Sequence, residues 1–316
     1  MKVRNLIFNM APILGLLVLV IGYFVVGTIN GINVTYGLKA VVNQSVVVAV
    51  VATGAVFIYT MGSFDISLGA STAVSALVAG MVYLRTENLM LTFITSICVA
   101  VLVALLNSVL AGVFNLPVFV TTIAMLSVLN ALVLLLININ GTGSEVKVPS
   151  DAVKSLDTLG FKILILVMYF AICVFLFDYT PVGRRQKILG GNPLCAKLTG
   201  ISINKYSIIA FVICGLGVGL GAFLSIVYAP TLTRSTASSV GMDVIIAIVF
   251  GGMPVSGGTK SRIYAAVIGA FSMSFLSQIM VMFNLNSGVG QMVKAAIFLL
   301  VVFIAAGERK TRTLPR

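Results

Sequence analysis

The sequence predicts an all-α polytopic membrane protein with about ten transmembrane helices. Of its 316 residues, 59% are hydrophobic and only 9% are charged, and the mean hydropathy is +1.16. Soluble domains carry roughly 25% charged residues, so a soluble domain is excluded. Apolar runs of about 20 residues, the length that a bilayer core requires, recur along the whole chain.

Ten apolar segments are expected to cross the membrane as helices. No soluble domain interrupts them, so residues 1–316 are expected to form a single transmembrane domain. The third and eighth segments are short and rich in small residues, which is typical of broken or short helices. The longest connections cover residues 139–162 and 179–206. The ten segments cover residues 9–29, 41–62, 69–84, 91–113, 118–138, 163–178, 207–228, 243–258, 263–283 and 289–306.

The formal net charge of +12 is explained by the orientation of the chain in the membrane. In a soluble protein it would favour a nucleic-acid partner, but cytoplasmic loops of membrane proteins also carry an excess of Lys and Arg. Ten spans with a cytoplasmic N-terminus place loop 179–206 inside, together with both basic chain ends. That loop has five basic and no acidic residues, whereas the outer loop 139–162 is balanced. We therefore expect cytoplasmic N- and C-termini, contact with membrane lipid, and no nucleic acid.

The reactive side chains give no support for an enzyme. The chain has no histidine, and its four cysteines, Cys98, Cys173, Cys195 and Cys214, form no CxxC pair. His-based metal sites, proton relays and nucleophilic triads are therefore excluded, and zinc or disulfide interpretations have little support. We expect no catalytic residue and no metal ligand, and we interpret the cysteines as small packing residues.

Residues 251–262, GGMPVSGGTKSR, look like a nucleotide-binding loop but fail its spacing. Such a loop needs a Lys directly after the second glycine of G-x-x-x-x-G and follows a β-strand. Counted from Gly252, that glycine is Gly257, and Gly258 stands where the Lys is needed. Glycines and a proline instead break a helix, and broken backbone at membrane depth needs protein or water around it. Two interpretations stay open: a structured inner hairpin that includes Gly251, or a plain turn.

Residues 215–222, GLGVGLGA, match the residue types of the dinucleotide-binding pattern G-x-G-x-x-A but not its structural context. They lie within a predicted membrane helix, and no strand precedes them. Gly215 and Gly219 are four residues apart, as are Gly217 and Gly221, and this spacing lets two helices approach closely. We therefore predict helix packing here.

Three further stretches combine with the glycine pairs at 251–258. They are GSFDISLGA at 62–70, LPVFVTTIAMLSVLNAL at 116–132 and GRRQKILGGNPLCAKLTGISINKYSI at 183–208. Together, in order from about residue 41 to 306, they resemble the permease subunits of bacterial ABC importers for monosaccharides, of the ribose-permease type.

The resemblance is carried by the order of several weak motifs. The family pattern G-G-I-D-L-S-V-G is met at Gly62, Asp65, Ser67 and Gly69, but Phe64 replaces a smaller aliphatic residue. The family's L-G-G-x-x-x-x-G-G is met by Gly251, Gly252, Gly257 and Gly258. The cytoplasmic pattern G-G-N-x-x-A-A-x-x-x-G-I is met at Gly190, Gly191, Asn192, Ala196, Gly200 and Ile201, with Cys195 in place of the first alanine.

The resemblance implies a transport subunit that binds no cofactor and hydrolyses no ATP itself. In such importers a separate cytoplasmic ATPase holds ATP and Mg, and an extracytoplasmic binding protein delivers the solute. Two permeases pair in the bacterial plasma (inner) membrane, as two copies or as a copy with a sister permease. The solute, the composition of the pair and the envelope type of the host are not determined by these residues.

Loop 179–206 also predicts a short helix from its own residues. Asn192 suits the N-cap and Pro193 the first helical position. Gly200 suits the end of the helix, and two leucines four residues apart would share one apolar face. A solvated basic loop that only sets topology is the alternative. By resemblance, ATPase coupling is assigned to Gly190, Gly191, Asn192, Pro193, Ala196 and Gly200.

Polar side chains within the apolar segments are candidates for a translocation path. An ionised Asp in a bilayer costs about 2.5–3.5 kcal/mol. Asp65 is therefore expected either to face a cavity or partner, or to lie in water at the inner turn and cap the helix at 67–83. Amides suit sugar hydroxyls because they both donate and accept hydrogen bonds, although they also join helices. The candidates are Asp65, Ser67, Asn43, Gln44, Asn107, Asn130 and Gln278.

Two peripheral features complete the expectations. Lys294 is expected to extend its side chain outward from the last span. Within loop 139–162, a short helix capped by Ser150 would face the binding protein.

Rival functions are also open. An ion-driven secondary transporter usually holds several intramembrane carboxylates, and this chain has chiefly Asp65 and Asp243, both near span ends. A membrane-embedded enzyme lacks a convergent acid pair. Within the resembled family, a nucleoside or furanose-like signal is the alternative to a monosaccharide.

Overall fold

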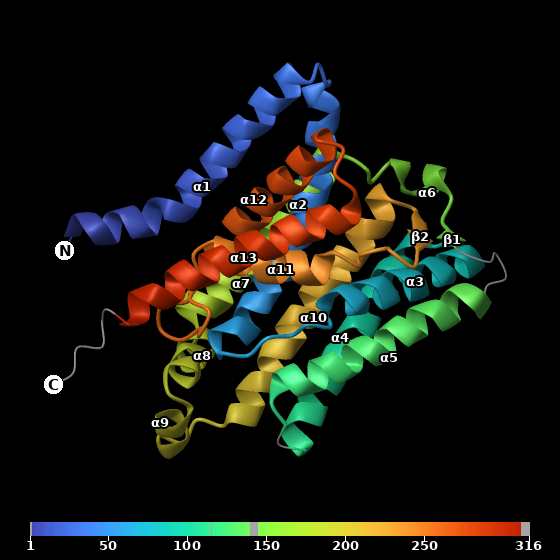
Figure 1. Ribbon diagram of the computed structural model, residues 1–316. Coiled ribbons are helices and arrows are strands. Elements are labelled where there is room, and N and C mark those ends of the chain that lie inside the picture. The colour runs from blue at the N-terminus through green and yellow to red at the C-terminus, as the bar shows by residue number, and fades with distance from the viewer. Residues whose placement is uncertain (1, 115, 140–144, 311–316) are drawn as a thin grey trace.

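The computed structural model describes residues 2–114, 116–139 and 145–310, which form a bundle of helices (Figure 1). Ten of its helices correspond in order to the ten predicted apolar segments. They are α1 (Lys2–Ile29), α2 (Val34–Thr60), α3 (Leu68–Thr86), α4 (Leu89–Val113), α5 (Val118–Ile139), α7 (Leu159–Val174), α10 (Ile203–Tyr228), α11 (Val240–Phe250), α12 (Tyr264–Met282) and α13 (Ser287–Lys310). The short elements are β1 (Glu145–Lys147), α6 (Ser150–Lys154), the π-helical turn η1 (Phe175–Tyr179), α8 (Pro181–Gly191), α9 (Pro193–Leu198) and β2 (Thr231–Thr233).

Eight of the described helices are long and apolar enough to cross a membrane. The helix α11 and the apolar part of α13, Gly288–Phe303, are shorter. The all-α polytopic class is therefore confirmed. The predicted extent of the eighth segment, 243–258, is wrong, because α11 ends at Phe250. Gly252 has a φ of +90°, which takes the chain out of the helical path and into a hairpin.

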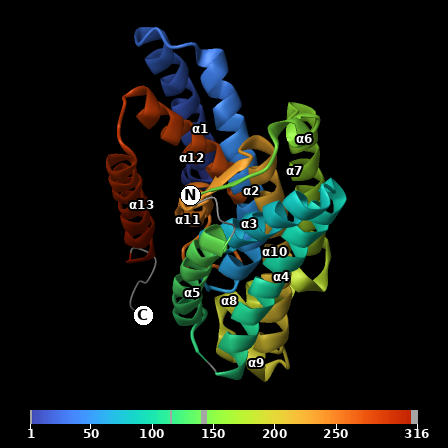
Figure 2. The same ribbon diagram turned by 90° about the vertical axis from the view of Figure 1, so that its right-hand side faces the viewer.

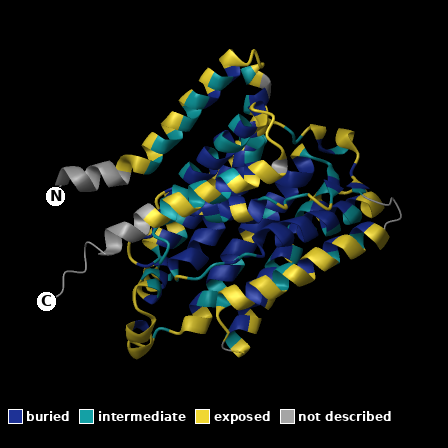
Figure 3. Cartoon of the chain, viewed as in Figure 1, coloured by how far each residue is buried: buried dark blue, intermediate teal, exposed yellow. Residues whose placement is uncertain are grey.

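Helices α2, α3 and α10 form the centre of the bundle, where most side chains are buried (Figure 3). The peripheral helices α1, α5 and α13 instead expose large apolar side chains, among them Val18, Leu135 and Phe303. Lipid tails are as apolar as these side chains, so no hydrophobic drive buries them in a bilayer. The exposed apolar surface therefore fits contact with membrane lipid.

The glycines of α10 let it pack closely against two neighbours. A Cβ added at Gly219 would lie 2.5 Å from the Cα of Ile97 on α4, and one added at Gly217 would lie 2.9 Å from a carbonyl oxygen of α2. Real Cβ atoms do not come so close, so the backbones themselves are in contact. Gly215 faces α4 with Gly219, and Gly221 faces α2 with Gly217. The predicted helix packing is confirmed.

We expect Gly219→Val to destabilise the bundle strongly. Overpacking costs typically about 1–3 kcal/mol, and the α4 backbone cannot move aside as a flexible side chain could. The thermal midpoint in mild detergent measures the effect. Gly160→Ala on α7 is the matched control, since no atom lies within 4 Å of its new Cβ. Equal midpoints for the two variants would contradict the close packing.

The two ends of the bundle carry different short elements. The start of α1 and the end of α13 lie at the end that holds α8 and α9, whereas α6, β1 and β2 lie at the opposite end (Figures 1 and 2). Strands β1 and β2 pair antiparallel, with Val146 opposite Leu232. This placement agrees with termini on the side of the basic loop 179–206.

The predicted helix of the outer loop is present as α6, but its expected cap is wrong. Pro149 precedes the helix and makes no side-chain cap bond, and Ser150 is already the first helical residue. The start of that loop, residues 140–144, lies outside the described part of the chain.

Candidate functional site

Helix α11 spans only about half of a membrane. Its 11 residues rise about 16 Å, whereas the apolar core of a bilayer is about 30 Å thick. Its C-terminal end leads into the hairpin of residues 251–263, where Gly258 lies against Gly191 at the end of α8. Because that hairpin lies at the inner end, the first residue of α11, Val240, lies near the middle of the membrane.

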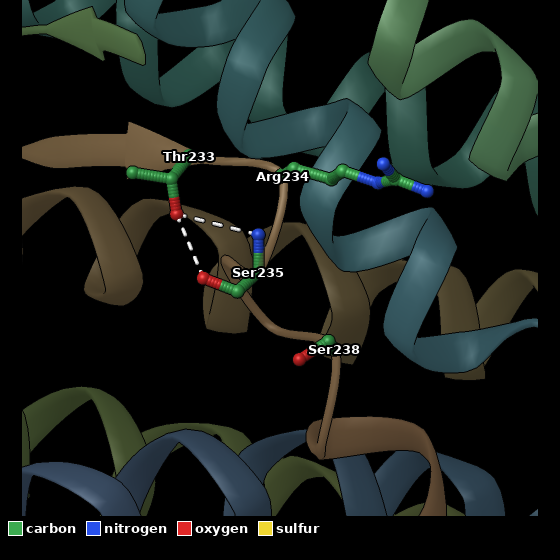
Figure 4. A pocket seen from close by; sticks show the side chains of 4 residues that line it. All are labelled: Thr233, Arg234, Ser235 and Ser238. Atoms are coloured by element: carbon green, nitrogen blue, oxygen red, sulfur yellow. Dashed lines mark hydrogen bonds between the residues drawn. The ribbon is translucent and has the colours of Figure 1, made fainter. Parts of the chain in front are cut away.

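Residues 234–239, which connect β2 at the outer end to the start of α11, therefore run as irregular backbone from the outer end down to about half the depth of the membrane. With Thr233, three of them, Arg234, Ser235 and Ser238, line an open hollow of about 510 Å³ (Figure 4). The hydroxyl oxygens of Thr233 and Ser235 lie 2.9 Å apart, and Arg234 points away from them. Irregular backbone in a membrane is stable only where protein buries it or water reaches it. Since Arg234, Ser235 and Ser238 are exposed, we expect water in this hollow.

The N-terminal ends of α3 and α11 meet beside this hollow. A Cβ added at Gly69 would lie 2.9 Å from both the carbonyl oxygen of Ala237 and the backbone nitrogen of Gly241. The two backbones are therefore in direct contact. Each helix N-terminus presents unpaired N–H groups and the positive end of its dipole. The N-terminal ends of α3 and α11 are thus brought together at about half the depth of the membrane.

Asp65 lies behind the start of α3 in a buried chain of hydrogen bonds. Its Oδ1 accepts from the backbone N–H of Ser67 at 2.8 Å and from the Ser67 hydroxyl at 2.6 Å. Asn107 Nδ2 donates to the Ser67 hydroxyl oxygen at 2.9 Å. The predicted turn before the helix is present, but the N-cap is Ser67 and the expected position in water is wrong, since Asp65 is only 3% exposed. The reason is that residues 61–67 run from the end of α2 into the bundle rather than along its surface. The alternative expectation is confirmed, because Asp65 faces a partner, Ser67, and a small cavity that Asn107 also lines.

The other predicted path residues do not line the hollow. Asn43 Oδ1 accepts a hydrogen bond from Lys162, which also pairs with Asp157. Asn43 therefore links α2 to α7. Burial raises the pKa of Asp157, but hydrogen bonds and charges from Lys162 and Lys39 outweigh it and hold that pKa below its usual value. Of the remaining candidates, Gln44 and Gln278 are half-buried and Asn130 is exposed.

Lys294 does not extend outward as predicted. Its Nζ donates to Asp243 Oδ1 at 2.6 Å, and both residues are buried. Asp243 lies in the first turn of α11, and a carboxylate at this depth attracts the ammonium group more strongly than the distant interface does.

The glycine-rich hairpin joins three parts of the chain. The N–H of Gly258 donates to the carbonyl oxygen of Thr60, at the end of α2, at 2.9 Å. A Cβ at Gly190 would lie 2.8 Å from the Gly258 nitrogen and would overlap the Thr60 carbonyl. Gly252, Gly257 and Gly258 all have positive φ. Of the two interpretations left open by the sequence, the structure has the structured hairpin, which is packed against α2 and α8.

Helix α9 forms as the sequence predicts. Asn192 Oδ1 accepts from the N–H of Cys195 at 3.0 Å, and Pro193 is the first helical residue. Gly200 follows the helix with a φ of +79°, a conformation that glycine adopts without strain. Ala196 is fully buried against α8 and α10.

The outer face of α9 carries an exposed apolar pair. Leu194 is 68% exposed and Leu198 is 80% exposed. The helix projects from the inner end of the bundle, beyond the other elements (Figure 1). Apolar side chains on a projecting helix at the basic, cytoplasmic end are poorly placed for lipid contact and typical of a protein-docking surface.

Comparison with known proteins identifies the family. The model for the permease component of branched-chain amino acid transport systems matches residues 37–304. The chain belongs to this permease family. The matched range includes the residues of the hollow, the hairpin and α9.

Individual relatives of the permease are bacterial import proteins. It is 24% identical over 275 residues to a ribose import permease protein of Escherichia coli K12, covering 84% of each chain. It is 26% identical over 301 residues to the ribose import permease protein of Bacillus subtilis, covering 94% of the permease and 92% of that protein. It is 26% identical over 277 residues to an autoinducer 2 import system permease protein of an Enterobacter species, covering 85% and 79%.

These relatives are transport permeases rather than enzymes, and the permease is a multi-pass protein of the bacterial (inner) membrane. No solved structure matches the chain.

Sequence reasoning missed the residues that line the hollow of the permease. The run TLTRSTASS at 231–239 holds six hydroxyl residues and one arginine, directly before a short apolar segment. That combination is the signal that could have found them. From the sequence this run is readily interpreted as an ordinary outer loop. How far it enters the membrane can be recognised only once α11 is known to be short.

Proposed function

We propose that the chain is the transmembrane subunit of an ATP-driven importer that moves a monosaccharide inward past the hollow. The observation that carries this proposal is the polar connection 234–239, which runs from the outer end to the start of the half-length helix α11. Only a water-accessible path makes such a backbone tolerable in a bilayer. Broken helices whose ends meet near the midplane form solute sites in other transporters.

The chemistry of the hollow favours a neutral, hydroxyl-rich solute. Hydroxyls of Thr233, Ser235 and Ser238 both donate and accept hydrogen bonds, and the guanidinium of Arg234 donates several. No carboxylate is among the described residues that line the hollow, which disfavours a cation. Its volume of about 510 Å³ lies within the ~300–1,000 Å³ of small-molecule sites. The names of two relatives, which import ribose, support a sugar.

A second permease, either another copy or a sister chain, would complete the path. The hollow is open on the surface of one chain, and lipid cannot satisfy Arg234. Arg234 directly follows β2 near the outer end, but the connection continues inward to the start of α11, and irregular backbone there is tolerated only beside protein or water, so a partner that encloses water is favoured. The path would then lie close to the axis that relates the two permeases.

The energy would come from a cytoplasmic ATPase that binds ATP and Mg and docks on α9, within loop 179–206. Contacts run from α9 through Gly190 to Gly258 in the hairpin, and so to α11. Closure of the ATPase would therefore shift α11 and alternate the access of the hollow. An extracytoplasmic binding protein would dock at the other end, on loop 139–162.

The test begins with purification of the tagged chain from its own membranes in gentle detergent. We expect an ATPase in near-stoichiometric amount and, after reconstitution with it and the binding protein, ATP-dependent uptake of labelled ribose. Uptake by the chain alone, driven by an ion gradient, would contradict the proposal and support a secondary transporter.

A furanose-like signal is the second candidate solute. One relative is named for the import of autoinducer 2, at an identity similar to that of the ribose relatives. Mass spectrometry of the ligand that remains on the co-purified binding protein distinguishes this signal from a monosaccharide and from a nucleoside.

A further inference from the structure

One ion pair inside the bundle connects the last helix to the start of α11. Lys294 Nζ lies 2.6 Å from Asp243 Oδ1, and the two residues are 9% and 1% exposed. Among the described residues, the other three ion pairs use Asp157 or Asp178, both near helix ends and with side chains at least 26% exposed. The Lys294–Asp243 pair therefore differs from them in depth and in burial.

Stability alone does not account for this pair. Burying two charges costs several kcal/mol of desolvation, and apolar side chains of similar volume often stabilise as well or better. Asp243 Oδ2 has no hydrogen-bond partner in the described part of the chain, so the pair is not fully compensated. Such a pair is better explained by the geometry that it imposes.

The pair acts on the segment that shapes the hollow. Asp243 lies in the first turn of α11, four residues after Ser239, the last residue of the connection that lines the hollow. On the α3 side, a Cβ at Gly241 would lie 3.1 Å from the nitrogen of Gly69. The start of α11 is thus held between α3 on one side and Lys294 of α13 on the other.

We infer that Lys294 is a positioning residue for transport. By pairing with Asp243 it fixes the start of α11, so that the connection 234–239 keeps the shape of the hollow. This inference rests on the proposed function, in which that hollow is the path of the solute. Removing both charges should leave a folded protein whose hollow is no longer held in one shape.

The experiment uses a buried reporter cysteine, Val240→Cys at the first residue of α11, in a full-length chain that also carries Cys98→Ser and Cys195→Ser. These two substitutions remove the exposed native thiols, whereas the two remaining cysteines are buried. The rate of maleimide labelling of the reporter is measured in this background and after adding Lys294→Met and Asp243→Asn together. The matched control is Lys39→Met, which removes the ammonium of an exposed ion pair.

We expect the doubly neutralised chain to keep its thermal midpoint but to label about tenfold faster, because labelling follows local opening. Uptake by the reconstituted importer is compared between the background chain and the doubly neutralised chain, both without the reporter cysteine, and it should fall in the neutralised chain. The Lys39→Met variant should match the background in labelling rate and in uptake. An unchanged labelling rate in the doubly neutralised chain overturns the inference. Because labelling requires no solute, this outcome differs from failure of the proposed function, in which the unmodified chain imports no sugar.

Discussion

Replacing Leu194 and Leu198 of α9 with glutamate is expected to separate the permease from its ATPase without unfolding the bundle. Both side chains are largely exposed in the isolated chain, so their loss removes little packing within it. Burying a leucine stabilises by about 1.5–3 kcal/mol, so loss of two buried leucines weakens docking by at least about 100-fold. Two buried carboxylates would weaken it further.

Co-purification of the ATPase and ATP-dependent uptake measure the effect. Both should be lost, whereas the thermal midpoint of the permease should stay unchanged. Ile29→Glu is the matched control, because Ile29 is 77% exposed but is the last residue of α1, at the opposite end of the bundle and outside loop 139–162. Retained ATPase binding in the double variant would contradict docking on α9.

The end of α9 allows a finer test of the same surface. Gly200 has a φ of +79° and no atom near its missing Cβ, so substitutions there act through backbone strain rather than collision. Gly200→Val should displace α9 and lower uptake, whereas Gly200→Asn should be tolerated because Asn adopts this conformation more readily. Equal uptake by the two variants would show that the precise end of α9 does not matter for coupling.

Arg234→Met is expected to weaken solute uptake with little effect on folding. Arg234 is exposed at the hollow, and methionine keeps much of its stem but none of its donors. A hydrogen bond to a charged group contributes about 1.5–3 kcal/mol, so KM for uptake should rise about 10- to 100-fold. Because the Arg234 side chain is exposed, the thermal midpoint should stay unchanged.

The control for this variant is Arg85→Met. Arg85 is also exposed, but it lies in the last turn of α3, away from the hollow. Uptake by this control should match the unmodified permease. If Arg234→Met left KM unchanged in the reconstituted importer, the hollow would not be the solute path.

Local features of this protein could be predicted because they depend on neighbouring residues. Asn192, Pro193 and Gly200 fix the two ends of α9 by capping and by backbone conformation, and the structure has that helix. The spacing of Gly215 and Gly219 placed both on one side of α10, where α4 does approach. Each of these predictions needs only the period of a helix and the conformational range of a few residue types.

The sequence by itself determined the class of protein, the order of its apolar segments and the form of α9. Only the tertiary structure decided depth and pairing. It showed that α11 is half a span, that the connection 234–239 lines a hollow at the start of α11, and that Asp65 and Lys294 are buried beside partners from other helices. These facts depend on contacts between residues far apart in the chain, such as Gly69 with Gly241, and hydropathy along a segment carries no information about them.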